Sequence, residues 1–380
     1  MLLQIRRISN GSLEAGRQPW LTAARLAIVG CLLVATVIGV RGFLYGDTPV
    51  LRVGRSPSAL VVSPDGRTIY LANSDDSITP VSAATGKAGR RIAISNGSPG
   101  MDAGTDSLAI TPDGRTLFTT VTDTVTQASL ALARVDLRTG REVGRVKVPG
   151  GVDQFVMSRD GRTLYVLSGD SVLYPVDVAT GRVETAIPAP DYMLESAVSM
   201  VLSPDGGTLY LSTNEDGPDG SDVLSGAVTP VNLRTGAAGT SIKLGWMPVS
   251  LAITPDGRTL YAAIDGVSGI GQLARNAVDV IDTATGQLRA ALPWQAAPLY
   301  LQMSPDGQTV WVASVVDHRI GTADNTVTGI EVATGRPGPS FPTAGWLNSY
   351  TDGPAGVAMS PDGRTLYVTV PSGLERLRVS

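Results

Sequence analysis

The chain has 380 residues, a formal net charge of −4, 44 glycines and 25 prolines, but one histidine and one cysteine. This composition suits short strands joined by many tight turns rather than a helical or disordered chain. Residues 1–41 carry a charge of +4, which leaves −8 for the remainder. An acidic remainder lacks the basic patch of a nucleic-acid-binding protein, so nucleic acid is not an expected partner.

The N-terminal segment has the character of an export or anchoring signal. Leu26 to Val40 are fifteen uncharged, mostly apolar residues, and the flank before them contains four arginines and a single glutamate. The arginines favour a cytoplasmic N-terminus, which places the rest of the chain outside the membrane. We therefore predict a cytoplasmic tail over residues 1–20 and a signal anchor over residues 21–44, with a cell-membrane, single-pass location.

Two other interpretations of this segment stay open. Fifteen residues lie between the 7–15 typical of a signal peptide and the ~20 that span a bilayer, so cleavage and secretion form one alternative. The absence of a small-residue cleavage site after Val40 favours the anchor. A buried core helix is the other alternative. Cys31 lies inside the segment, so no disulfide is expected in the remainder.

From residue 48 onward the chain is built on an internal repeat. An eight-residue pattern, S-P-D-G-R-T-L-Y in its last copy, begins at Ser63, Thr111, Ser158, Ser203, Thr254, Ser304 and Ser360. Proline at the second position is replaced once, by Arg159. Proline, aspartate and glycine in this order predict a tight turn between two strands, and the spacing is typical of solenoids and propellers.

Each repeat contains four strand-like segments. One apolar run precedes the turn, one follows it, and a third ends in a second turn signal, Thr-Gly, before a fourth run begins. Four strands per repeat correspond to one propeller blade. The eighth position is always a large aromatic residue, which we interpret as packing between repeats.

Two local matches carry a family resemblance. Residues Pro248 to Tyr261 closely match the pattern P-x-x-L-A-x-S-P-D-G-x-T-L-Y, with Thr254 at the Ser position, and Ala262 follows them. Residues Val278 to Gly286 match the pattern V-x-V-I-D-x-x-T-G. The chain from 48 to 380 thus resembles the YVTN-type seven-bladed β-propellers, which include lactonase-like enzymes and binding proteins. The resemblance implies an all-β, seven-bladed propeller with four-stranded blades.

The blade count leaves one strand missing at the C-terminus. Thr48 to Val53 has strand character and no blade before it. We expect it to complete the seventh blade and to close the ring, which removes the exposed sheet edges.

The predicted topology sorts the connections into two faces. The S-P-D-G-type and Thr-Gly turns form a regular face, whereas the long connections form a variable face, where binding usually resides. The segment 214–226 brings Glu215 and Asp216 to the variable face. Trp246, Trp294 and Trp346 lie in three successive blade-to-blade connections, either as an aromatic rim for a sugar or apolar ligand or as covers for the blade ends.

Candidate catalytic and metal-binding residues are few. His318, in a long variable-face loop, is the one histidine available as a general base, and a solvated loop histidine is the alternative. Asp106 and Asp153 stand five residues before their turns, where they approach the central channel. Two carboxylates there suit calcium, but the equivalents in other blades are not acidic, so these two alternatively line a hydrated channel.

The sequence therefore favours a membrane-anchored, extracytoplasmic propeller that binds a protein, cell-wall or small-molecule ligand through its variable face. The alternative is a lactonase-like hydrolase with its site at the central channel. No cofactor other than calcium is suggested by any motif.

Overall fold

The computed structural model describes residues 50–53, 57–73, 77–94, 98–99, 108–122, 129–170, 172–188, 197–215, 225–244, 247–266, 276–315, 325–343, 356–370 and 373–379. The chain divides into two compact units, Met1–Asp47 and Thr48–Ser380. The predicted anchor over 21–44 lies outside the described residues. Within the ranges just given, no helix has the length and apolar character needed to cross a bilayer.

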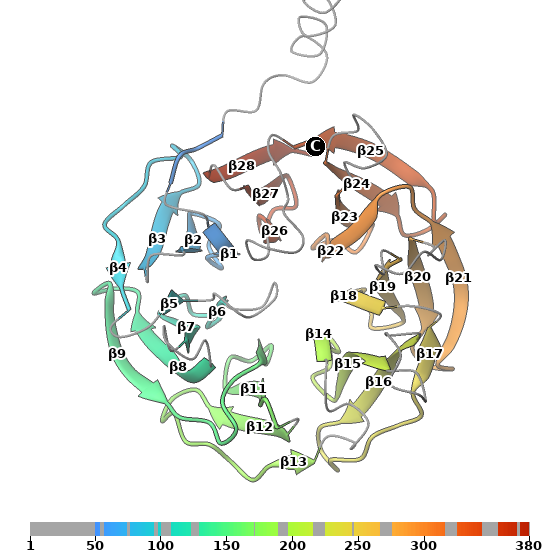
Figure 1. Cartoon of the computed structure of the whole chain (residues 1–380). Helices are drawn as coiled ribbons and strands as arrows, with labels where there is room; N and C mark the ends of the chain where they lie inside the picture. Colours follow the sequence, from blue (N-terminus) through green and yellow to red (C-terminus); the bar gives the residue numbers. More distant parts are fainter. Residues whose placement is uncertain are drawn as a thin grey trace, which may run out of the picture. The chain divides into compact units, whose positions relative to one another are not determined.

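Seven antiparallel sheets surround a common centre, so the unit from Thr48 is the predicted seven-bladed propeller (Figure 1). Chain order runs outward within each blade. The first three blades comprise β1 Pro57–Val62, β2 Thr68–Asn73, β3 Ser77–Ser82 and β4 Ile92–Ala93; β5 Ser98–Pro99, β6 Leu108–Ile110, β7 Thr116–Thr122, β8 Ser129–Asp136 and β9 Arg141–Val146; and β10 Gln154–Met157, β11 Thr163–Leu167, β12 Val172–Asp177 and β13 Ile187–Pro188.

The remaining blades follow the same plan. They comprise β14 Ala197–Leu202, β15 Thr208–Glu215, β16 Ser225–Asn232 and β17 Ile242–Leu244; β18 Met247–Ile253, β19 Thr259–Asp265, β20 Ala277–Asp282 and β21 Gln287–Pro293; β22 Ala297–Met303, β23 Thr309–Val315, β24 Thr326–Glu331 and β25 Pro337–Pro342; and β26 Val357–Met359, β27 Thr365–Val370 and β28 Gly373–Arg378. The extra strand β5 pairs with β7, which makes the second sheet five-stranded.

The core lies between the blades, as the aromatic position of the repeat predicts. Phe118, Tyr210, Tyr261, Trp311 and Tyr367 are buried and belong to the hydrophobic clusters that join neighbouring blades. Burial also raises the pKa of Tyr261 and Tyr367. This column therefore packs the blades together.

Prolines of the repeated turns form a ring of contacts with glycines of the next blade. A Cβ added to Gly307 would lie 2.7 Å from Cδ of Pro255, and one added to Gly257 would lie 3.3 Å from Cδ of Pro204. This ring of contacts is closed, because a Cβ added to Gly66 of the first blade would lie 3.2 Å from Cδ of Pro361 in the last blade. The exception is Gly206, which has no neighbour within 4 Å because Arg159 replaces the proline. There Arg159 Nη1 donates to Pro204 O at 3.4 Å.

Outer-strand aliphatic side chains form a second ring, against the Thr-Gly glycines. Ile92, Val146, Ile187, Ile242 and Leu292 each lie next to the Thr-Gly glycine of the following blade. Each of these residues also pairs across the sheet with a third-strand residue that occupies the equivalent position in every blade, for example Ile92 with Ile78 and Val146 with Leu132.

Leu51 takes this place for the seventh blade. It pairs with Leu374 of β28, with Leu51 N donating to Leu374 O at 2.8 Å and Leu374 N donating to Leu51 O at 3.0 Å. A Cβ on Gly86 would lie 2.8 Å from Leu51 Cδ1. The segment around Leu51 therefore serves as the fourth strand of the last blade, where the blue and red ends of the chain meet (Figure 1).

Candidate functional site

The regular face is formed by turns whose polar groups bond to one another. In the first copy Ser63 Oγ donates to Asp65 Oδ1 at 2.6 Å, and Asp65 Oδ1 accepts from Arg67 N at 3.0 Å. Ser63 Oγ also accepts from Thr68 N at 2.9 Å. The glycine that follows has φ near +70°, a conformation that other residues rarely adopt. The same pattern recurs in all seven copies.

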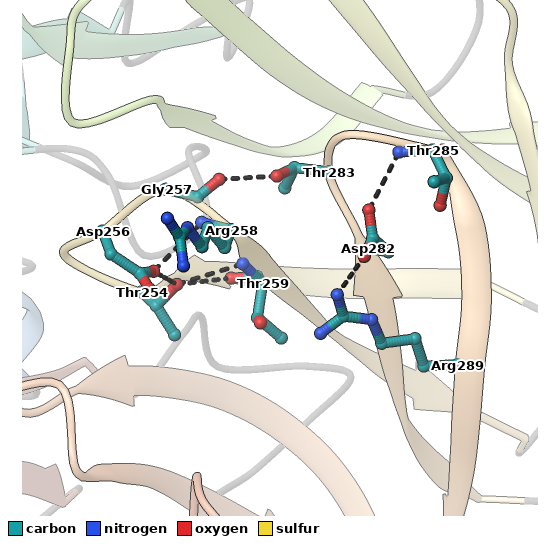
Figure 2. A network of polar contacts seen from close by, with 9 residues as sticks. All are labelled: Thr254, Asp256, Gly257, Arg258, Thr259, Asp282, Thr283, Thr285 and Arg289. Atoms are coloured by element: carbon teal, nitrogen blue, oxygen red, sulfur yellow. Dashed lines mark hydrogen bonds and ion pairs between the residues drawn. The ribbon is translucent and has the colours of Figure 1, made fainter.

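A backbone hydrogen bond joins the S-P-D-G-type turn of each blade to the residue that follows the third strand, which begins the Thr-Gly turn in the six blades that have one. In blade five Thr283 N donates to Arg258 O at 3.1 Å, and Thr283 Oγ1 donates to Gly257 O at 2.6 Å. Figure 2 shows this link beside the Thr254–Asp256 contact and the ion pair of Arg289 with Asp282. Equivalent backbone bonds occur in the other six blades, from Ala83 to Arg67 through Val379 to Arg364.

These hydrogen bonds give the repeated aspartates a structural role in the turns. Two hydrogen bonds hold the pKa of each turn carboxyl below its ordinary value: the larger effect comes from the Ser or Thr hydroxyl and the smaller from a backbone N–H. The carboxyls are those of Asp65, Asp113, Asp160, Asp205, Asp256, Asp306 and Asp362. A carboxylate stabilised in this way is a poor general base. The most conspicuous acidic motif of the sequence thus builds turns.

The variable face is formed by the connections at the other end of the strands. One fully described connection of this face joins blades two and three, where Gly150 and Gly151 adopt φ of +73° and +83°. Gly169 N donates to Gly150 O at 3.2 Å, so the connection between blades contacts the turn inside blade three. A side chain at Gly150 would collide with the Asp170 carboxylate.

Trp294 packs at this face between two blades. Its indole N–H donates to Ser314 Oγ of blade six at 2.7 Å, and its backbone N–H donates to Asn276 O of blade five at 2.9 Å. The half-buried ring packs on the cluster that contains Tyr261 and Val312. Trp294 therefore links blades five and six, as expected of a residue that covers the blade ends.

Most of the other predicted site residues lie outside the described ranges: His318, Asp106, Asp216, Trp246 and Trp346. Glu215 ends β15, where its backbone pairs with Ser225. The structure therefore brings together no set of predicted catalytic residues among those it describes.

Asp153 is the predicted channel carboxylate that the structure describes. It lies directly before the inner strand β10, and its N–H donates to Leu167 O at 2.8 Å. The side chain is half-buried, and burial raises the pKa of its carboxyl.

Three buried carboxylates lie in strands that the sequence patterns did not single out. Asp265, Asp279 and Glu375 are 6%, 5% and 0% exposed, and each makes interactions within the protein. Asp279 and Glu375 occupy a third-strand position that is Thr79 and Thr229 in other blades. Alignment of the third strands would have revealed this substitution of acid for threonine. No group of three or more potential metal ligands occurs among the described side chains.

Comparison with known proteins identifies the fold of the chain. No family model matches it. The hydrazine synthase subunit beta of Kuenenia stuttgartiensis is 29% identical over 143 residues, a match that spans 35% of this chain and 36% of that protein. The solved Kuenenia stuttgartiensis hydrazine synthase has a chain that superposes with a TM-score of 0.69 at 21% identity, covering 86% of this chain and 96% of its own. The likeness establishes the seven-bladed β-propeller, a fold that supports many unrelated functions.

Proposed function

We propose that this protein is a membrane-anchored, extracytoplasmic β-propeller that works as a ligand-binding or interaction module through its variable face. The observation that carries the proposal is the contrast between the two faces. Polar groups of the regular face bond to one another blade after blade, whereas the long and irregular connections all leave from the opposite end. Variable loops on a rigid scaffold are the usual place of recognition.

The comparisons support an interaction role at the level of the fold. The curated relative is named as a subunit, and propellers present broad faces suited to partners. The YVTN-type motifs at Pro248 to Ala262 and Val278 to Gly286 agree with this class, which contains binding proteins as well as lactonase-like enzymes. The basic flank and the apolar segment Leu26 to Val40 support the membrane anchor.

Capture of a partner from extracytoplasmic and cell-wall material tests the interaction role. Full-length protein is compared with a variant in which residues 216–224 are replaced by a short Gly-Ser linker, and with Trp346→Ala. Loss of a captured species in these variants supports the proposal. The matched control is Gln308→Ala, an exposed change on the regular face, which should capture normally.

A lactone panel assayed with the same proteins tests the competing hydrolase. Turnover that disappears in His318→Ala would favour the lactonase-like function, because a positioned general base contributes ~10²–10⁴-fold to rate. Absence of turnover together with loop-dependent capture would favour the interaction module.

A further inference from the structure

The outer parts of three neighbouring blades carry an excess of positive charge that the acidic composition hides. The outer part of a blade is its third strand, its fourth strand and any turn between them. In blades seven, one and two these parts are residues 373–379 with 50–53, 77–94 and 129–148; they hold eleven cations and three acids, a net charge of +8. The outer parts of blades three to six are residues 172–188, 225–244, 277–293 and 326–343; they hold five cations and five acids, a net charge of zero. We call the outer part of blades seven, one and two the basic edge.

The cations of the basic edge face solvent, whereas its acids are covered. All of these cations are exposed except Arg134, which is half-buried. Of the three acids, Glu375 is 0% exposed, and Asp136 and Glu142 are half-buried. The surface of this edge therefore presents mainly positive charge.

Several of the exposed cations have no acid to balance them. Lys87, Arg90, Arg141 and Lys147 form no ion pair with any residue that the structure describes. They come from the outer parts of blades one and two, at both ends of the segments that contain β4 and β9. Such a group of charges attracts an extended anionic surface more strongly than any one of them does.

The three blades form one continuous edge. Arg376 Nη1 of blade seven donates to Ala83 O of blade one at 2.9 Å. A Cβ added to Gly140 of blade two would lie 3.7 Å from Ile92 Cγ1 of blade one. The strands β28, β4 and β9 accordingly follow one another along the outside of the ring (Figure 1). The positive charge is therefore concentrated on one side of the propeller.

The chain enters the propeller within the basic edge. Leu51 packs against Gly86 of blade one, and the next residue, Arg52, is exposed. Six residues, 45–50, separate Leu51 from the proposed anchor over residues 21–44. Six fully extended residues span about 20 Å. An inserted anchor would thus keep this edge, rather than the far side of the ring, on a short tether to the bilayer.

We propose that the basic edge docks on the anionic headgroups of the membrane in which the protein is anchored. Lysine and arginine side chains near a bilayer are attracted by anionic lipid, over a Debye length of about 8 Å at physiological salt. The outer parts of the other four blades have no net charge, so this attraction also orients the propeller. Docking by an edge leaves the variable face accessible to a ligand. The inference rests on the proposed function, because it names the surface that contacts the membrane of the anchored protein.

The three lysines of the chain can report this docking. Lys87 and Lys147 belong to the basic edge, whereas Lys243 belongs to blade four. Full-length protein is reconstituted in nanodiscs of phosphatidylcholine or of a phosphatidylcholine–phosphatidylglycerol mixture, and mass spectrometry follows acetylation at each lysine. Anionic lipid shields an amine and favours its charged, unreactive form, so we expect acetylation of Lys87 and Lys147 to slow at least about threefold in the anionic discs. Lys243 should react equally in both.

Two double variants with the same change in charge separate the basic edge from the rest of the surface. Arg90→Glu with Arg378→Glu should remove the protection of Lys87 and Lys147. The matched control, Arg234→Glu with Arg336→Glu in blades four and six, should keep it; all four arginines are exposed. Melting temperatures show that both variants are folded. Salt at about 1 M, where the Debye length is about 3 Å, should abolish the protection of the unmodified protein.

Several outcomes would overturn the docking. They are equal acetylation of Lys87 and Lys147 in both discs, equal slowing at all three lysines, and protection that survives in the Arg90→Glu, Arg378→Glu variant. Protection by soluble polyglutamate but not by phosphatidylglycerol would assign the basic edge to an anionic polymer and overturn the lipid assignment. Protein that stays in the discs without protection refutes the docking but leaves the anchor standing. A full-length chain that the discs do not retain overturns the anchor and the docking together.

Discussion

At the scale of single residues, glycine is required in the repeated turns for two separable reasons. Every turn glycine has φ near +70°, which costs other residues about 1–2 kcal/mol. Most of these glycines also face a proline of the preceding blade, whereas Gly206 faces open space. The replacement of proline by Arg159 therefore provides a natural control for the contact between blades.

Gly307→Ala and Gly206→Ala should differ in their effects on stability. Both place a methyl group at φ near +70°, but only the first brings it within 2.7 Å of Pro255 Cδ. We expect about 1 kcal/mol of destabilisation for Gly206→Ala and about 2–3 kcal/mol for Gly307→Ala. Urea unfolding of both variants measures the difference, and equal losses would show that the proline contact contributes little.

The turn carboxylates also predict how stability depends on pH. Their pKa values are lower in the folded chain than the ordinary value of 3.8, chiefly through hydroxyl donors such as Ser63 and Thr254. The unfolded chain therefore binds more protons in this range, so the stabilisation is complete above about pH 5 and is lost as the pH falls through the folded values. We expect a flat melting temperature from pH 7 to pH 5 and a decline below pH 4. Carboxyl resonances that titrate at or above 3.8 for these aspartates would contradict the assignment.

At the scale of elements, the ring is closed by a very short piece of chain. Leu51 makes two backbone bonds to Leu374 and fills the place that Ile92, Val146 and their equivalents fill in other blades. Val53 is 4% exposed and packs with Leu60 and Tyr367, one in the first blade and one in the last. Closure thus depends on a few apolar side chains as well as on hydrogen bonds.

Leu51→Ala should weaken this closure without changing the strands. Removal of most of a packed leucine side chain costs about 2 kcal/mol. Arg52→Ala, the exposed neighbour, should leave stability within about 0.5 kcal/mol of the wild type. The midpoint of urea unfolding reports both changes. Two variants with the same midpoint would show that the segment is not needed for closure.

At the scale of the whole molecule, the proposed anchor and the propeller make separate predictions. Each blade packs mainly on its neighbours, so the propeller from Thr48 has its own core. The apolar segment Leu26 to Val40 is therefore expected to determine location rather than stability.

Replacement of Leu32 and Leu33 by glutamate should abolish membrane retention or export. Each charge at the centre of a span costs about 2.5–3.5 kcal/mol on insertion scales. Fractionation of cells that express the full-length chain measures retention, and protease added outside the cells reports the side on which the propeller lies. Leu32→Ile with Leu33→Ile is the matched control. Unchanged retention of the glutamate variant would rule out the anchor.

The blade number, the strand order and the position of the closing segment can be predicted from the sequence alone. These follow from local chemistry, because each S-P-D-G-type turn forms from residues within five positions of one another and the Thr-Gly turn repeats at a fixed place in the blade. It also identified the aromatic column as packing, and it aligned Asp153 with Ser58 and Val249 by distance from the turn.

The contacts between side chains of different blades become known from the folded structure. Three such contacts join residues 20 or more positions apart, and no local pattern sets those distances. They are the packing of Leu51 against Gly86, the contact of Pro255 with Gly307 and the hydrogen bond from Trp294 to Ser314. The same holds for Asp153. The sequence predicts an acid near the centre of the ring, whereas the half-burial that raises the pKa of its carboxyl follows from the packing of the assembled blades.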